Sequence, residues 1–185
     1  MPGKIIILNG APRSGKTTLA KTIQTTFSGV WLNLGVDHMM ACTPASALPG
    51  IGLRPGGERP ELEPLIQRMY QGLFASIAGY ARLGLNVVAD LDIHDDYATP
   101  QHVWPLMLQT FADLSLLLVG VTAPMAVIQQ RRLATWGQSE SAMITQRWEQ
   151  AVHLGHQYDL MVDTDQLTPR ATAERIRMAM DARVL

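Results

Sequence analysis

The sequence predicts an α/β fold in which a parallel sheet is covered by helices on both faces. Short apolar segments rich in β-branched residues alternate along the chain with segments of helical periodicity. Residues 114–121 form an almost unbroken apolar run, which is typical of strands that are buried on both faces. Because strands that alternate with helices form right-handed βαβ units, the sheet should be parallel and bind ligands at the carboxyl ends of its strands.

The chain has the length and composition of one ordinary globular domain. It contains 185 residues, of which 47% are hydrophobic and 17% charged, with a formal net charge of −1. We therefore interpret residues 1–185 as a single domain. The near-neutral charge lacks the basic excess that is typical of nucleic-acid-binding proteins, so no nucleic-acid partner is expected.

The sequence also bears on the compartment in which the protein works. No apolar run approaches the roughly 20 residues that cross a bilayer, and the run Ile5–Leu8 is too short for the core of a signal peptide. We expect a cytoplasmic protein without a membrane partner. Cys42 is the only cysteine, which excludes an internal disulfide and a cysteine-cluster metal site, and we expect it to be a small buried side chain.

The first third of the chain begins with a strand, a turn and a helix, at 4–9, 10–15 and 16–27. A second short strand is expected at 30–34, and it ends at Gly35-Val36-Asp37. Residues 44–64 contain five prolines and four glycines and show neither helical nor strand periodicity. A loop of this length inside one domain is uncommon, so we expect it to be functional.

The rest of the chain continues the alternation. Apolar residues spaced by three and one between Leu62 and Ala81 predict one long amphipathic helix, which Gly84 ends. Thr168 and Pro169 form a favourable N-cap and N1 pair for the last helix. The other expected elements are strands at 87–90, 114–121 and 160–162 and helices at about 100–111, 124–133 and 141–154.

The segment Gly10–Thr17 carries the most specific motif. Its sequence, Gly-Ala-Pro-Arg-Ser-Gly-Lys-Thr, matches G-x-x-x-x-G-K-[ST] and lies between an apolar strand and a helix, as the mechanism requires. Backbone N–H groups of such a loop and the positive end of the helix dipole bind phosphate oxygens. Lys16 should bridge the β- and γ-phosphates, and the Thr17 hydroxyl should hold Mg²⁺. With ATP and Mg²⁺ as cofactors, the predicted nucleotide-binding residues are Gly10, Ala11, Pro12, Arg13, Ser14, Gly15, Lys16, Thr17 and Thr18.

Carboxylates follow two of the predicted strands. Asp90 ends an apolar strand, as the aspartate of a Walker B strand does, and is the expected metal residue beside Thr17. Asp92 lies on the same face if that strand continues, and the alternative for both aspartates is a capping or solvated loop position. Asp37 should lie at the same edge, within reach of the γ-phosphate, where a carboxylate can accept the proton of an attacking hydroxyl. Its alternative is a surface loop.

The chain resembles a known family at several points. They are Ile6–Gly10 with the loop that follows, Trp31 with Gly35-Val36-Asp37, the strand ending in Asp90, and the string Val152-His153-x-Gly155-x-x-Tyr158-Asp159-x-x-Val162-Asp163-Thr164. Together they resemble the chloramphenicol phosphotransferase-like P-loop kinases, from the N-terminus to about residue 164. The resemblance implies a P-loop NTPase fold of the nucleoside-kinase type. It also implies transfer of the ATP γ-phosphoryl group to an alcohol of a small molecule, chloramphenicol in the founding member.

The same resemblance assigns roles to individual residues. Asp37 matches the aspartate taken as the catalytic base, and Lys16 and Thr17 match the residues for phosphate and Mg²⁺. In this family the lid, a segment after the fourth strand, carries several arginines, whereas residues 134–138 of this chain contain none. Within a lid at about 131–147, Arg131 is therefore the expected catalytic arginine.

Other residues of the resembling segments have open roles. Arg132 or Arg147 could share the γ-phosphate with Arg131, and either arginine of the pair 131–132 could instead be a solvated helix residue. The loop at 44–64 should lie on the acceptor side. The sequence assigns no role to His153, Tyr158 or Asp159.

The function expected from these features is that of an ATP-dependent phosphotransferase of the antibiotic-modifying type. One alternative is a P-loop kinase for another small hydroxyl compound, such as a nucleoside, a sugar acid or a natural product. Another is a non-catalytic, nucleotide-binding regulatory module. A GTPase would need an Asn-Lys-x-Asp segment that reads guanine, and the sequence contains none. The sequence specifies neither the acceptor nor the oligomeric state.

Overall fold

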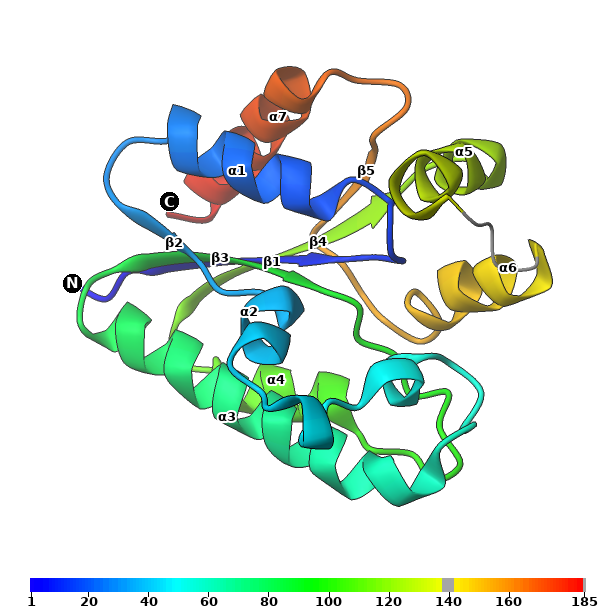
Figure 1. Ribbon diagram of the computed structural model, residues 1–185. Helices are drawn as coiled ribbons and strands as arrows, with labels where there is room; N and C mark the ends of the chain where they lie inside the picture. The colour runs from blue at the N-terminus through cyan, green and yellow to red at the C-terminus, as the bar shows by residue number, and fades with distance from the viewer. Residues whose placement is uncertain (138–141, 185) are drawn as a thin grey trace.

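A five-stranded parallel sheet with strand order β2-β3-β1-β4-β5 forms the centre of the fold (Figure 1). The computed structural model describes residues 1–137 and 142–184. The strands are β1 (Lys4–Asn9), β2 (Trp31–Asn33), β3 (Asn86–Leu91), β4 (Ser115–Thr122) and β5 (Leu160–Asp163). The helices are α1 (Lys16–Thr26), α2 (Val36–Ala41), α3 (Glu63–Arg82), α4 (Val103–Thr110), α5 (Met125–Trp136), α6 (Ala142–Ala151) and α7 (Pro169–Asp181).

The central strand β1 is buried on both faces, and alternate residues pack into two separate cores. Ile6 and Leu8 face α1 and α7, whereas Ile5 and Ile7 face α3 and α4. Figure 1 shows these two helix pairs above and below the sheet, with α5 and α6 beside its carboxyl edge. In the part of the chain that the structure describes, no helix is long and apolar enough to cross a membrane.

The register of the sheet brings distant segments together at its carboxyl edge. Asn9, the last residue of β1, pairs with Leu91 at the end of β3 and with Gly120 near the end of β4. Because the three strands run parallel, the segments that follow them begin side by side. The turn after β1 is therefore next to the residues that follow β3, and ligands of such sheets bind at this edge.

The predicted fold class and order of elements are confirmed, and four local predictions are wrong. The second strand ends at Asn33, and a short helix, α2, follows it, so Asp37 lies in the first turn of a helix and does not end the strand. Residues 44–64 are not structureless, because they form three short 3-10 turns, at Ala45–Ala47, Gly50–Leu53 and Pro60–Leu62.

Cys42 is exposed, contrary to the prediction that it is buried. It is the C-cap of α2, so the helix that carries Val36 and Met39 into the core ends before it. The predicted helix at 141–154 also ends earlier, at Ala151, since Leu154 and Gly155 form an exposed turn.

Candidate active site

The loop between β1 and α1 has the conformation of a phosphate cradle. A Cβ on Gly10 would lie 2.1 Å from the carbonyl oxygen of Val121, and Gly15 has a φ of 106°, so both positions require glycine. The Lys16 ammonium donates hydrogen bonds to the carbonyl oxygens of Gly10 and Ala11, over 2.7 and 2.8 Å. Lys16 therefore lies across the loop, where a phosphate group can replace these carbonyl oxygens as its partner.

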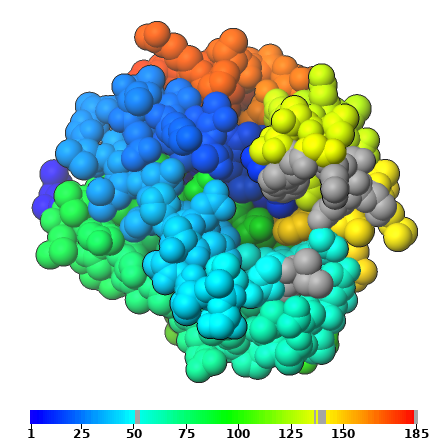
Figure 2. Space-filling model, in the orientation of Figure 1, coloured from blue at the N-terminus to red at the C-terminus, as the bar shows by residue number. Residues whose placement is uncertain are grey.

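Two cavities open on either side of this loop and share Arg13, Lys16 and Thr17 in their walls. The larger has a volume of about 310 Å³ and lies against α1, α5 and the segment after β5. The smaller has a volume of about 140 Å³ and contains three carboxylates, those of Asp37, Asp90 and Asp92. Figure 2 shows the face on which the blue, cyan and yellow segments surround a recess with green atoms at its floor. The phosphate loop thus separates a roomy compartment from an acidic one.

Thr17 and Asp90 form a polar pair suited to a divalent cation. The Thr17 hydroxyl donates to Oδ2 of Asp90 over 2.7 Å. The other oxygen, Oδ1, lies against the backbone of Gly35, where an added Cβ would be only 1.8 Å from it. A hydroxyl and a carboxylate oxygen are ligands that Mg²⁺ prefers, and Mg²⁺ commonly takes few protein ligands together with phosphate oxygens and water. The residues present therefore fit the metal that the P-loop implies.

Asp92 joins Asp37 in the smaller cavity, although β3 ends at Leu91. The Tyr70 hydroxyl of α3 donates to Oδ1 of Asp92 over 3.2 Å. Burial raises the pKa of the Asp92 carboxyl, and this rise is opposed by the positive charge of Lys16. The structure thus brings the two aspartates together beside Lys16, one from a helix and one from the loop after a strand.

Arg131 of α5 lines the larger cavity. Its Nη1 donates to the Thr164 hydroxyl over 2.8 Å and to the Arg13 carbonyl oxygen over 3.3 Å. The Thr164 hydroxyl in turn donates to the Ser14 carbonyl oxygen over 2.6 Å. Arg131 is therefore fixed to the phosphate loop on the side of the larger cavity.

The other two arginines considered for the γ-phosphate lie elsewhere. Arg132 is buried and donates to the Thr145 hydroxyl over 2.7 Å. Arg147 makes a two-pronged ion pair with Asp96, over 2.7 and 2.9 Å. Neither lines either cavity. Part of the predicted lid, residues 138–141, lies outside the described residues.

A buried hydrogen-bond network behind the loop contains two of the residues whose role the sequence leaves open, His153 and Tyr158. Oδ1 of Asn9 accepts from the backbone N–H of Ile93. Nδ2 of the same side chain donates to the Val152 carbonyl oxygen over 2.9 Å, and it also lies 2.9 Å from the Tyr158 hydroxyl. That hydroxyl also lies 3.0 Å from Nδ1 of His153, and burial raises the pKa of Tyr158 to about 12. These residues hold the end of α6 against the carboxyl edge of the sheet.

Asp159 and Glu149 have different positions around this network. Asp159 accepts from the backbone N–H of Leu118, so it secures the start of β5, and it lines neither of the two cavities beside the phosphate loop. Glu149 accepts from the Thr122 hydroxyl over 2.5 Å and lies 3.6 Å from Nε2 of His153. Sequence reasoning missed Glu149, although a spacing of four residues from His153 in the helix predicted at 141–154 would place the two side chains on one face.

Comparisons with known proteins agree with this geometry. Two Mycobacterium tuberculosis proteins, from strains CDC 1551 and H37Rv, are each described as a presumed O-phosphotransferase and are 29% identical over 102 residues, which cover 48% of this chain and 45% of theirs. The chain spans about half the length of these curated relatives that it matches.

Solved structures resemble the whole chain. The thymidylate kinase of Candida albicans superposes with a TM-score of 0.68 at 16% identity, covering 98% of this chain and 92% of that one. The APS kinase of Mycobacterium tuberculosis, solved in complex with AMPPNP and APS, superposes with a TM-score of 0.66 at 15% identity. The match covers 97% of this chain and 98% of that one. Such low identities establish the fold alone, that of P-loop kinases. Since the model of one family matches residues 3–181, nearly the full length, this chain belongs to the chloramphenicol phosphotransferase-like proteins.

Proposed function

We propose that the protein transfers the γ-phosphoryl group of ATP to a hydroxyl group of a small molecule. The observation that carries this proposal is the position of Lys16 and Thr17 between two cavities, one large and one lined by Asp37, Asp90 and Asp92. A kinase needs a nucleotide on one side of the transferred phosphate and an acceptor on the other. Membership of the family and the likeness to P-loop kinases support the same reaction class.

In this proposal the larger cavity holds the nucleoside of ATP and the loop Gly10–Thr18 holds its phosphates. Lys16 exchanges the carbonyl oxygens of Gly10 and Ala11 for phosphate oxygens. Thr17 and Asp90 would hold Mg²⁺, which supplies positive charge to the phosphates when it is bound. Arg131, already fixed beside the loop by Thr164, adds a second fixed positive charge.

Asp37 is the proposed base on the acceptor side. The acceptor oxygen attacks the γ-phosphorus, and the bond between that phosphorus and the oxygen bridging it to the β-phosphorus breaks, so that ADP leaves with the electron pair. The proton of the attacking hydroxyl passes to the Asp37 carboxylate. In phosphoryl transfer most of the rate enhancement comes from position and charge, and a carboxylate that receives the proton adds to it.

The acceptor compartment supports a kinase over a passive nucleotide-binding module. Such a module has no need of Asp37, yet this residue lines the same cavity as Asp90 and Asp92. Chloramphenicol is the acceptor implied by the family name, and a nucleoside, a sugar acid or another natural product is the alternative. The loop at 44–64 differs most in composition from the rest of the chain, and loop variation changes specificity while the phosphate machinery stays fixed.

The proposal is tested with a panel of small alcohols that includes chloramphenicol. Each alcohol is incubated with the protein and Mg-ATP, and ADP and the phosphorylated product are measured by mass spectrometry. We expect ADP and product in equal amounts for at least one alcohol, and none with Lys16→Ala. ATP binding without transfer to any alcohol would contradict the proposal and favour the regulatory module.

A further inference from the structure

Arg13 of the phosphate loop has a backbone conformation that arginine rarely adopts. Its φ of 71° lies in the left-handed region, and among the described residues His102 is the other non-glycine residue with a positive φ. Glycine adopts such a conformation without strain, as Gly15 does in the same loop. Strained backbone of this kind is concentrated at functional sites, so an arginine at this position points to a use for its side chain.

Arg13 also lies at the boundary between the two cavities. It lines both of them, as do Lys16 and Thr17, which already have roles in binding phosphate and metal. Among the arginines that the structure describes, Arg13 is the only one that lines the smaller cavity, which contains Asp37. The transferred phosphoryl group must pass from the nucleotide side to the acceptor side. Arg13 is therefore rooted where a guanidinium group can stay with that group during the transfer.

Arg131 directs its hydrogen bonds to the protein backbone around the loop. Its Nη1 donates to the Arg13 carbonyl oxygen and the Thr164 hydroxyl, and its Nη2 donates to the Thr164 carbonyl oxygen over 3.2 Å. Arg131 lines the larger cavity and not the smaller one. It therefore acts from the nucleotide side, where it holds the backbone of Arg13 in place.

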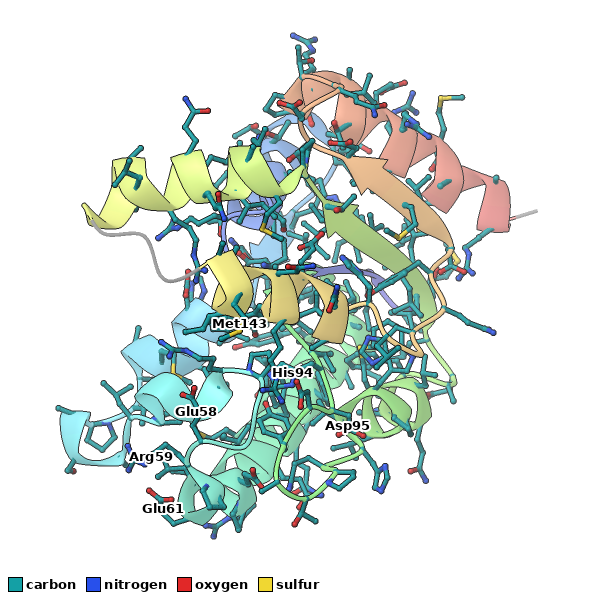
Figure 3. All side chains as sticks on the ribbon, turned by 90° about the vertical axis from the view of Figure 1, so that its right-hand side faces the viewer. Glu58, Arg59, Glu61, His94, Asp95 and Met143 are labelled. Atoms are coloured by element: carbon teal, nitrogen blue, oxygen red, sulfur yellow. The ribbon has the colours of Figure 1, made fainter. Side chains whose placement is uncertain are left out.

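Three other arginines, from the loop at 44–64 and from α6, are paired with carboxylates. The pairs are Arg54 with Glu58, Arg59 with Glu61 and Arg147 with Asp96. Figure 3 shows Arg59 and Glu61 close together in the segment before α3. None of these three arginines lines either cavity, and residues 134–138 contain no arginine. The charge of a γ-phosphoryl group at the boundary between the cavities is thus left to Lys16, the metal and Arg13.

We propose that the Arg13 guanidinium contacts the γ-phosphoryl group and neutralises its charge during transfer, the role that the resemblance gives to Arg131. This inference rests on the proposed function and adds a catalytic residue to the same site. A guanidinium group offers two parallel donors to phosphate oxygens and stays charged at any working pH. No bond to Arg13 forms or breaks and no proton leaves it, because it acts through position and charge.

Nucleotide affinities test this contact without an acceptor, because ADP lacks the γ-phosphate. In Arg13→Gly the dissociation constant of Mg-ATP, measured by calorimetry, should rise by about tenfold or more, the worth of one charge-assisted hydrogen bond, whereas that of Mg-ADP should stay within about twofold. Arg131→Gln should weaken both nucleotides by similar factors, since Arg131 acts from the nucleotide side. Arg82→Gln is the control: Arg82 is exposed at the end of α3, where it pairs with Asp113, and the change should leave both affinities unaltered.

Transfer and stability should respond to Arg13→Gly in opposite ways. Single-turnover transfer to the best alcohol of the panel should fall by about 10²–10³-fold, and guanidinium ions at a low, non-denaturing concentration should restore part of it. Arg13→Lys keeps the charge without the paired donors, so its rate should lie between those of wild type and Arg13→Gly. The urea midpoint of Arg13→Gly should equal or exceed that of the wild type, because glycine adopts a φ of 71° without strain.

The outcomes separate this inference from the function on which it rests. Equal losses of ATP and ADP affinity in Arg13→Gly, or wild-type affinity for both, would overturn the inference. An ATP-selective loss in Arg131→Gln in place of Arg13→Gly would overturn it as well and return the role to Arg131. If the wild type phosphorylates no alcohol of the panel, the kinase proposal fails, whereas the two affinities still decide whether Arg13 contacts the γ-phosphate.

Discussion

The Thr17 hydroxyl donates a hydrogen bond to Oδ2 of Asp90 over 2.7 Å and so joins the first turn of α1 to the end of β3. The backbone of Gly35 packs against the other oxygen of the same carboxylate. Asp90 is only 8% exposed, so its position is set from two sides before any ligand binds. A preformed arrangement of this kind reduces the cost of ordering the metal site when Mg-ATP arrives.

Replacing Gly35 by alanine should disrupt that arrangement. The new Cβ would lie 1.8 Å from Oδ1 of Asp90 and 2.7 Å from its carbonyl oxygen, so the carboxylate must move. We expect Mg-ATP affinity, measured by calorimetry, to fall by at least about tenfold, the cost of one misplaced charged ligand. Gly79→Ala in α3 is the control, because no atom lies within 4 Å of its added Cβ, and the alanine should leave ATP binding unchanged. Wild-type affinity in Gly35→Ala would contradict the assigned metal site.

The network centred on Asn9 should contribute to stability as a unit. Asn9→Ala leaves the buried Ile93 N–H without its side-chain acceptor and removes one of the donors to the Val152 carbonyl oxygen, so it should lower the free energy of unfolding by about 1–3 kcal/mol. Tyr158→Phe should lower the free energy of unfolding by less, because the groups that contact the Tyr158 hydroxyl keep other hydrogen-bond partners. Since the two side chains touch, the double variant should lose less than the sum of the single losses. If the two losses in free energy of unfolding, measured by urea denaturation, add up strictly in the double variant, Asn9 and Tyr158 act independently.

His94 should make stability depend on pH. Its ring is buried, with Nε2 2.9 Å from the Leu53 carbonyl oxygen and Nδ1 accepting from the Asp96 N–H, an arrangement that suits the neutral form. Burial lowers the pKa of His94 below its ordinary value of 6.5, so the unfolded chain takes up the proton first as the pH falls. The stability from His94 is therefore complete above about pH 6.5 and is lost as the pH falls from 6.5 towards the lower folded pKa.

The measurement is the free energy of unfolding in urea between pH 7.5 and 5.5. We expect it to fall with pH in the wild type by up to about 1.4 kcal/mol per unit for each such histidine. His94→Gln should have a shallower dependence, although not a flat one, since burial also lowers the pKa of His156. Identical slopes for wild type and His94→Gln would show that the His94 pKa is the same in the folded and unfolded chains.

The sequence predicted those parts of the molecule that depend on local patterns. The strand, glycine-rich loop and helix at residues 4–27 follow from apolar periodicity and from a motif whose conformation is encoded within eight residues. Helix α2 is not predictable in this way, because six residues are too few to show helical periodicity, and the sequence therefore predicts Asp37 at the end of a strand. Glu149 and Asn9 were missed for another reason: each acts through partners far along the chain, as the separation of 84 residues between Asn9 and Ile93 illustrates.

The central claim is that this chain transfers a phosphoryl group with Asp37 as the base, and Asp37→Asn tests it most directly. The asparagine keeps the size and much of the hydrogen bonding of the carboxylate and removes its ability to accept a proton. Single-turnover transfer to the best acceptor of the panel should fall by about 10²–10⁴-fold, mainly through kcat, while the ATP dissociation constant changes little. Transfer within a few-fold of the wild-type rate, or a collapse of ATP binding in its place, would contradict the account.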